Sequence, residues 1–205
     1  MVGDNAALPL PTSLTMTASH ARLRTQLQAY AVRHPEHAGL SADFQAVLDS
    51  ADNPFVRQRL QGHFTGSAWL VSADGQRALL MHHRKLERWL QPGGHADGEV
   101  DLAAVALKEA QEESGLPLLQ PEDTDGAIFD LDRHWIPERA GVPGHWHYDV
   151  RYVIRNTGSE AFVINAESLA LAWRQVADIA DDPASDASLV RMARRWLASP
   201  AMVGS

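Results

Sequence analysis

The segment from Asp101 to Ser114 constrains this chain more than any other part of its sequence. Its spacing predicts one helix, and the side chains along one face of that helix form a stripe that is apolar at the start and acidic at the end. At about 100° per residue, the stripe begins with apolar side chains: Leu102, Val105 and Ala106. It ends in three carboxylates spaced i, i+3 and i+4: Glu109, Glu112 and Glu113. The apolar end predicts contact with a core, and the acidic end needs a separate explanation.

Carboxylates gathered near a helix C-terminus repel one another and oppose the helix dipole. A hard divalent cation bound by their oxygens reverses both effects, and magnesium, held by few carboxylates plus substrate phosphates, suits such a site. Gly93 and Gly94 precede the helix and allow close backbone approach, so a carbonyl there offers another oxygen ligand. The alternative is an acidic helix end that faces solvent.

The sequence around this helix resembles the signature box of the Nudix hydrolases, magnesium-dependent enzymes that cleave a diphosphate linked to some group X. In that box a Gly is followed after five residues by Glu, and after seven more by R-E-U-x-E-E-x-G-U, where U is aliphatic. Here the box runs from Gly94 to Leu116, and its second half reads K-E-A-Q-E-E-S-G-L. The order of the expected elements resembles the family from Gly62 to about Pro200.

The resemblance implies roles at the matching positions. Glu109, Glu112 and Glu113 would bind the catalytic cations, Mg²⁺ or alternatively Mn²⁺, together with the carbonyl of Gly93. Glu112 or Glu113 would alternatively activate water, and the implied reaction is attack of that water on a phosphorus of the diphosphate. The general base of this family often lies on a later loop, where Glu167 is the candidate; the alternative is an ordinary surface glutamate.

Two positions depart from the box. Val100 replaces its first Glu, with Glu99 one place early, and Lys108 replaces its Arg. In the family these positions usually form a supporting ion pair and do not bind metal, so the resemblance implies weaker support and intact chemistry. Asp101 lies on the same side of the helix as Lys108, which predicts a substitute contact between them.

The stretch from His145 to Ile154 alternates as a strand does. One face is apolar and predicts core: Trp146, Tyr148, Val150, Tyr152 and Ile154. The other face is polar: His145, His147, Asp149 and Arg151. The polar face is interpreted either as solvent-facing or as the wall of a substrate pocket beside the carboxylate helix. A zinc site formed by His95, His145 and His147 is a third alternative.

Residues beside the Gly-rich bend are the remaining candidates for substrate contacts. His95 follows the glycines directly and is expected near the metal and the phosphates. Arg84, with Lys85 and Arg88, either binds phosphate or solubilises a hairpin. Trp89 either stacks on a base or packs into the core.

Composition excludes several classes of function. The net charge of −8 argues against extended nucleic acid or an anionic membrane as partner, and no apolar run approaches the roughly 20 residues that span a bilayer. With no cysteine, the chain has no thiolate nucleophile and no cysteine zinc site. The N-terminal residues lack the pattern of a secretory signal, so a cytoplasmic protein is expected.

The order of elements predicts an α+β fold, an α/β/α sandwich with a mixed sheet between helices. Residues 1–17 are expected to be a loose tail, residues 18–61 a helical extension and residues 62–200 the catalytic domain. Helices are expected at 18–34, 42–50, 54–61, 101–114, 173–179 and 185–198. Strands are expected at 64–71, 78–83, 127–132, 146–155 and 161–165.

The favoured function is hydrolysis of a nucleoside diphosphate-X or related small organic diphosphate. A catalytically decayed ligand-binding module is the alternative, and Val100 is its main support. An isoprenoid diphosphate isomerase is disfavoured because it relies on a catalytic cysteine, and RNA cap removal is disfavoured by the acidic charge. A homodimer formed through the N-terminal helices is one of three roles left open for them, besides covering the sheet and capping the pocket.

Overall fold

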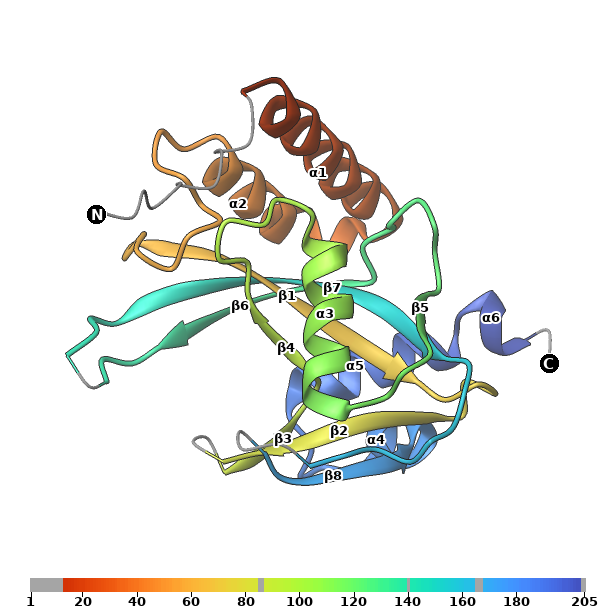
Figure 1. The fold of residues 1–205 in the computed structure, drawn as a ribbon. Coiled ribbons are helices and arrows are strands. Elements are labelled where there is room, and N and C mark those ends of the chain that lie inside the picture. The colour runs from red at the N-terminus through yellow and green to blue at the C-terminus, as the bar shows by residue number, and fades with distance from the viewer. Residues whose placement is uncertain (1–12, 85–86, 140, 165–167, 204–205) are drawn as a thin grey trace, which may run out of the picture.

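The computed structural model describes residues 13–84, 87–139, 141–164 and 168–203. Within them, eight strands form one mixed sheet with helices on both faces (Figure 1). The strands are β1 (Gly62–Val71), β2 (Arg77–His83), β3 (Arg88–Leu90), β4 (Gly93–His95), β5 (Leu119–Pro121), β6 (Asp130–Ile136), β7 (His145–Asn156) and β8 (Ser168–Gln175).

The centre of the sheet is the parallel pair β1 and β7, in the order β3-β2-β1-β7-β5. The short strand β4 pairs antiparallel with β1, β6 with β7, and β8 with β2. Every residue of β1 is buried, because both faces of this central strand are covered. The polar residues of β1 and β7 therefore lie inside the protein and not on its surface.

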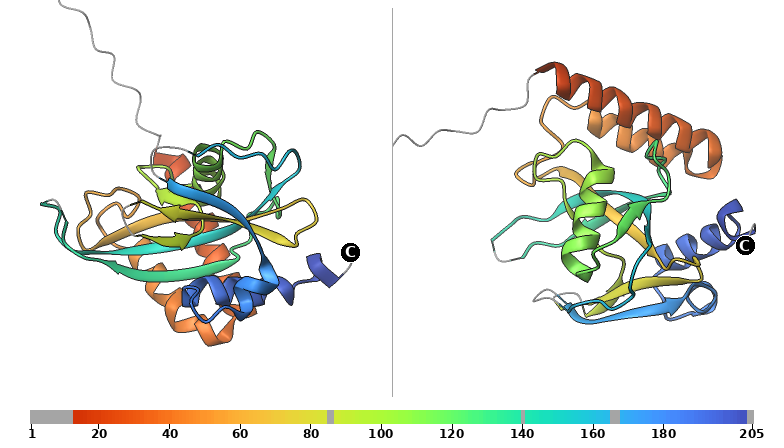
Figure 2. Two further views of the ribbon diagram at one scale, coloured as in Figure 1. Left: turned by 90° about the horizontal axis from the view of Figure 1, so that it is seen from below. Right: turned by 45° about the vertical axis from the view of Figure 1, so that its right-hand side comes forward.

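The helices are α1 (Ser13–Arg33), the 3-10 helix η1 (Pro35–His37), α2 (Ala38–Leu48), α3 (Leu102–Ser114), α4 (Val176–Asp181), α5 (Ala187–Leu197) and α6 (Pro200–Val203). Helices α1, α2 and α3 contribute to one hydrophobic core with Phe64 and Val150 of the sheet. Helices α4 and α5 form a second core with Trp69 and Val71 on the opposite face. Figure 2 shows α3 and α5 on opposite sides of the sheet, which confirms the predicted sandwich.

Helices α1 and α2 cover part of the sheet and share its core. Leu27, Tyr30 and Phe44 are completely buried, and the Phe44 ring lies 5.3 Å from that of Tyr148 on β7. Of the roles left open for the extension, the structure supports covering the sheet. In the part of the chain that is described, no helix is long and apolar enough to cross a membrane.

Most expected elements are confirmed, and three are wrong. Residues 54–61 form turns and no helix, since the carbonyl of Pro54 accepts a 2.8 Å hydrogen bond from the N–H of Phe64 and the Phe55 side chain enters the core. Residues 161–164 form no strand, and residue 165 lies outside the described residues. Residues 173–175 complete β8, so α4 begins only at Val176.

Candidate functional site

Helix α3 is fixed at both ends by its own sequence. The side chain of Asp101 accepts hydrogen bonds from the N–H groups of Ala103 (3.1 Å) and Ala104 (3.3 Å), which satisfies donors that a helix start leaves unpaired. Gly115 ends the helix in a left-handed conformation (φ 68°) that glycine adopts without steric cost. The three carboxylates are therefore held in the last turns of a well-bounded helix.

The apolar half of α3 lies directly against β1. A Cβ atom on Gly66 would stand 2.7 Å from the carbonyl oxygen of Leu102 and 3.0 Å from the Cβ of Val105. The missing side chain lets the helix approach the strand closely, and this contact buries the apolar residues of the helix face. This packing fixes the direction in which the acidic end of the stripe points.

The acidic end of α3 meets the backbone of β4. The carboxylate of Glu113, which is 4% exposed, accepts a 3.0 Å hydrogen bond from the N–H of Gly93. A Cβ atom on Gly94 would lie 2.5 Å from the carboxyl carbon of Glu109, so only glycine leaves room for that carboxylate. The side chain of Glu112 is 58% exposed and stands at the solvent side of the group.

Lys108 lies beside these carboxylates. Its ammonium is 3.7 Å from Glu109 and 3.4 Å from Glu112, and the charge of Glu109, followed by that of Glu112, raises the pKa of Lys108. Asp101 instead caps the helix and lies 3.6 Å from Arg22, so the predicted contact between Asp101 and Lys108 is wrong. The raised pKa reflects the negative charge concentrated at this end of the helix.

The donor set of this site fits a hard divalent cation. Three carboxylates and the backbone of a glycine strand supply only oxygen ligands on one side of α3, and oxygen ligands are those that Mg²⁺ and Mn²⁺ take. The closeness of Glu109 to Gly94, and of Glu113 to Gly93, brings the helix and loop parts of the predicted site together. The structure thus assembles residues that sequence alone could only place on separate elements.

Asp149 and Arg151, expected to contact substrate, lie in a buried charge network. Both are 2% exposed, and the Arg151 Nε donates to Asp149 over 2.7 Å. The remaining guanidinium nitrogens of Arg151 lie 3.2 Å from Asp130 and Asp132. Burial lowers the pKa of Arg151, but the charges of Asp149, Asp132 and Asp130 raise it more, so the guanidinium stays protonated. The solvent-facing interpretation of this strand face is therefore wrong.

Asp149 connects this network to the candidate site. Its carboxylate accepts hydrogen bonds from the hydroxyls of Thr65 (2.8 Å) and Ser67 (2.7 Å) on β1. Ser67 in turn packs on Gly93, where a Cβ atom would stand 2.1 Å from the Ser67 Oγ. A continuous series of contacts thus runs from Arg151 through Asp149 and Ser67 to the strand that meets Glu113. Asp149 and Arg151 are therefore buried behind the strand that meets Glu113, and their hydrogen-bonding groups are engaged by other residues of the protein.

His95 and His147 lie together on the same face of the sheet, with ring centroids 5.0 Å apart. Burial, and then the charges of Arg57 and His63, lower the pKa of His95 to about 4. Burial, and then His95 and His134, lower the pKa of His147 to about 2. Both imidazoles are neutral at pH 7, so each offers a ring nitrogen with a free lone pair and not a positive charge.

The other predicted residues contact further parts of the protein or lie outside the described residues. Arg84 is exposed and donates a 3.1 Å hydrogen bond to the carbonyl of Ser168, and Arg88 lies 3.5 Å from Asp186. Trp89 packs against the core under α4 and α5. The candidate base Glu167 and the basic residue Lys85 lie outside the described residues.

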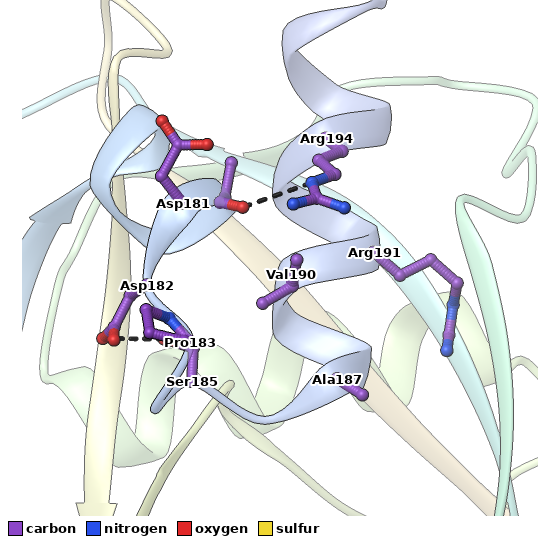
Figure 3. A pocket seen from close by; sticks show the side chains of 9 residues that line it. Asp181, Asp182, Pro183, Ser185, Ala187, Val190, Arg191 and Arg194 are labelled. Atoms are coloured by element: carbon purple, nitrogen blue, oxygen red, sulfur yellow. Dashed lines mark hydrogen bonds between the residues drawn. The ribbon is translucent and has the colours of Figure 1, made fainter.

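A pocket of about 640 Å³ opens on the other side of the sheet, between α4 and α5 (Figure 3). Its lining includes Asp181, Arg191 and Arg194. The guanidinium of Arg191 is engaged by Asp130 and Asp132, at 2.7 Å and 3.1 Å. This pocket therefore belongs to the α5 face and is separate from the carboxylate site.

Sequence reasoning missed four polar residues of the inner sheet face: His63, Thr65, Ser67 and Gln91. Three of them lie on β1. Small residues interrupt the alternation of polar and apolar side chains in this strand, so its polar face is not evident from the sequence. The available signal was the spacing of His63, Thr65 and Ser67 at every second position, which places them on one face.

Comparison with known proteins supports the resemblance. The NUDIX domain model matches residues 63–193, from β1 to α5, and leaves α1 and α2 outside. A hydrolase of the NUDIX family from Clostridium perfringens aligns with a TM-score of 0.50 and 23% identity, over 65% of this chain and 95% of that chain. The MutT protein from Methanosarcina mazei Go1 aligns with a TM-score of 0.50 and 17% identity, over 72% and 96%. No curated protein matches the sequence.

Proposed function

Because the chain belongs to the Nudix family of hydrolases, which act on diphosphate bonds, we propose that it is a magnesium-dependent pyrophosphohydrolase of a nucleoside diphosphate-X or related small organic diphosphate. One observation carries this proposal. The Glu113 carboxylate accepts a 3.0 Å hydrogen bond from the N–H of Gly93, and the Glu109 carboxylate occupies the space that the missing side chain of Gly94 leaves open. The chain therefore keeps the carboxylate and loop parts of the site, despite Val100 and Lys108.

The residues that would hold the cation are Glu109, Glu112, Glu113 and the carbonyl of Gly93, with Mg²⁺ preferred and Mn²⁺ a second candidate. When bound, such a cation neutralises phosphate charge and lowers the pKa of a water molecule. Glu113 is fixed by the N–H of Gly93, whereas Glu112 is largely exposed. Glu112 is therefore the better placed of the two to accept a proton from an incoming water molecule. Glu167 remains the predicted alternative base.

His95 and His147 are proposed to contact the substrate. Both are half-buried, neutral and located on the sheet face that continues from Gly93. A neutral imidazole donates one hydrogen bond to a phosphate or sugar oxygen without bringing a second cation to the site. The exposed Arg84 is proposed to reach a terminal phosphate from the β2 end of the sheet. The predicted partner is thus a small, negatively charged molecule.

The experiment is a hydrolysis assay on a panel of nucleoside diphosphate derivatives, with and without magnesium. We expect magnesium-dependent release of phosphate-containing products, and a loss of at least about 100-fold in kcat for the Glu112→Gln/Glu113→Gln variant. Glu138→Gln, at an exposed position in the β6–β7 hairpin, serves as the matched control and should keep full activity. An absence of turnover, together with no magnesium binding by calorimetry, would instead support a ligand-binding module.

A further inference from the structure

Five histidines gather at the start of the parallel pair β1 and β7, beside the carboxylate site and separate from it. They are His63 on β1, His95 on β4, His134 on β6, and His145 and His147 on β7. The register places His63 directly opposite His147. The rings of His63, His145 and His147 lie with centroids 4.9 to 5.1 Å apart. Four strands thus bring imidazoles from distant parts of the sequence to one point.

Backbone carbonyls fix the tautomers of two of these rings. The Nδ1 of His63 lies 3.2 Å from the carbonyl oxygen of Arg59, and the Nδ1 of His145 lies 2.8 Å from that of Pro143. A carbonyl oxygen only accepts hydrogen bonds, so each Nδ1 must carry the proton. The Nε2 of each ring is left with a lone pair, which is how protein environments prepare histidine for a metal ion.

The Nε2 of His63 has no hydrogen-bond partner within the described residues. His63 is 1% exposed, and its Nε2 is buried without a hydrogen-bond partner there. A buried polar atom of this kind destabilises the folded protein when it is left without a hydrogen bond. Since the tautomer leaves this nitrogen as an acceptor, the group that would satisfy it is a proton donor or a cation.

The spacing of the three rings fits a single ion. One ligand atom from each of His63, His145 and His147 lies within 4.8 Å of the other two. The Nε2 atoms of His145 and His147 are 3.2 Å apart and share a hydrogen bond, in which His147 donates because the Pro143 contact leaves the Nε2 of His145 as an acceptor. An ion bound between them would take the place of that proton. Ligands at about 2.0–2.1 Å from a tetrahedral zinc ion stand roughly 3.3 Å from one another. Two of the three rings thus already have the separation that a shared metal ion requires.

We propose that His63, His145 and His147 form a binding site for a transition-metal ion, with zinc as the ion that fits best. Imidazole nitrogens suit zinc and leave Mg²⁺ to the oxygen ligands of α3, so the two sites differ in the cation that they select. The ring of His95 lies 5.2 Å from that of His63 and 5.0 Å from that of His147, next to the three proposed ligands. The site does not depend on the proposed hydrolysis, but with His147 as a metal ligand the substrate contact proposed above falls to His95.

Binding at this site would fasten the first residues of β1 to those of β7. His95 links the cluster to the candidate active site, because it is two residues from Gly93 on β4. The site would therefore stabilise the sheet where it supports the Gly-rich strand. Its position differs from the zinc site expected from sequence, which used His95 and omitted His63.

The test is zinc titration by calorimetry on tag-free protein stripped with a chelator, followed by thermal unfolding with and without zinc. We expect one equivalent of zinc to bind and to raise the Tm, while magnesium does not compete. Even outer-shell partners change metal affinity by roughly 10–100-fold, so His145→Gln or His147→Gln should weaken zinc binding at least about 100-fold. His63→Gln should do the same, and far-UV circular dichroism establishes that each variant is folded.

Two controls separate this site from the carboxylates. His82→Gln, which alters a half-buried histidine on β2, should leave zinc affinity unchanged. Glu112→Gln/Glu113→Gln should also keep zinc affinity, even if it loses hydrolysis. X-ray absorption at the zinc edge should show nitrogen ligands from imidazole. Zinc binding that survives all three histidine variants, or that is lost in the carboxylate variant, would overturn the proposal, as would an absence of stoichiometric binding.

Discussion

At the scale of single residues, the candidate site is shaped by two glycines with different neighbours. The space beside Gly94 is filled by the carboxyl group of Glu109, which is the movable end of a flexible side chain. The space beside Gly66 is filled by the backbone of Leu102 and the side chain of Val105, neither of which yields easily. The first glycine therefore protects the position of a carboxylate, and the second protects the packing of the helix.

Gly94→Ala is expected to displace the Glu109 carboxylate without unfolding the protein. Magnesium affinity should fall at least about 10-fold, because a proposed ligand is moved, while the free energy of unfolding changes by less than about 1 kcal/mol. Calorimetry and urea denaturation measure the two quantities. Gly66→Ala is the contrasting variant and should lose about 2 kcal/mol of stability through overpacking. Equal losses of stability in both variants would contradict this distinction.

Lys108 offers a second prediction at this scale. The side chain is 64% exposed and its ammonium lies within 4 Å of two proposed ligands, so Lys108 competes with a bound cation and adds little stability. Lys108→Met should therefore raise magnesium affinity about 2- to 5-fold and leave the Tm nearly unchanged. A fall in magnesium affinity, measured by calorimetry, would show that Lys108 supports the site as the Arg of the family box does.

At the scale of elements, local signals predicted α3 and failed for the segment 54–61. The Asp101 cap, the Gly115 stop and the stripe between them are all carried by neighbouring residues, so sequence alone predicted the helix and its acidic face. In segment 54–61, Pro54 at the start and a short apolar pattern predicted a helix. Instead, the Phe55 side chain packs in the core against aromatic rings from other parts of the sequence. The Phe55 ring lies 5.2 Å from that of Phe64 on β1. Tertiary packing therefore determines the conformation of residues 54–61, and the local sequence pattern gives no sign of that packing.

The same contrast applies to the polar face of β7. Its alternation was predicted correctly, but its surroundings depend on pairing with β1 and β6, which the sequence does not reveal. Arg151 is consequently buried among carboxylates from two strands. The grouping of His63 with His145 and His147 was likewise missed, because His63 lies far from them in the chain.

The extent of the core under α1 gives an element-scale prediction. Leu27 is completely buried, whereas Val32 on the same helix is 82% exposed. Leu27→Ala should cost about 2–5 kcal/mol, and Val32→Ala less than about 0.5 kcal/mol. Urea denaturation monitored by tryptophan fluorescence measures both, with a single transition expected because α1 shares the sheet's core. A separate early transition in Leu27→Ala would show that the N-terminal helices unfold independently.

At the scale of the whole molecule, one ion network joins the sheet to helices at both ends of the described chain. Asp130 on β6 is fully buried and accepts hydrogen bonds from Arg151, Arg191 and Arg195. Arg195 on α5 also donates to the hydroxyl of Tyr30 on α1, over 3.0 Å. Removing one member of such a buried group leaves an unpaired charge, so these elements should lose stability together.

Asp132 makes this network sensitive to acid. Burial raises its pKa, but the hydrogen bond from His134 and the charges of Arg151 and Arg191 lower it more, so the folded pKa lies below the unfolded value near 3.8. A carboxyl group of this kind contributes stability that is complete above the unfolded pKa and is lost as the pH falls through the folded pKa. The contribution should therefore be constant near neutrality and decline below about pH 4.

Asp132→Asn should be less stable than the parent protein by about 2 kcal/mol at pH 7, because charge-assisted hydrogen bonds to Arg151 and Arg191 are weakened. The difference should shrink as the pH is lowered from 5 toward 2, since the unfolded parent chain then protonates Asp132 while the folded parent keeps it ionised, which favours unfolding of the parent. Urea denaturation across this pH range measures the difference, with the exposed Asp52→Asn as control. A difference that stays constant with pH would mean that Asp132 acts through its shape alone, and the network would then contribute nothing to acid sensitivity at this position.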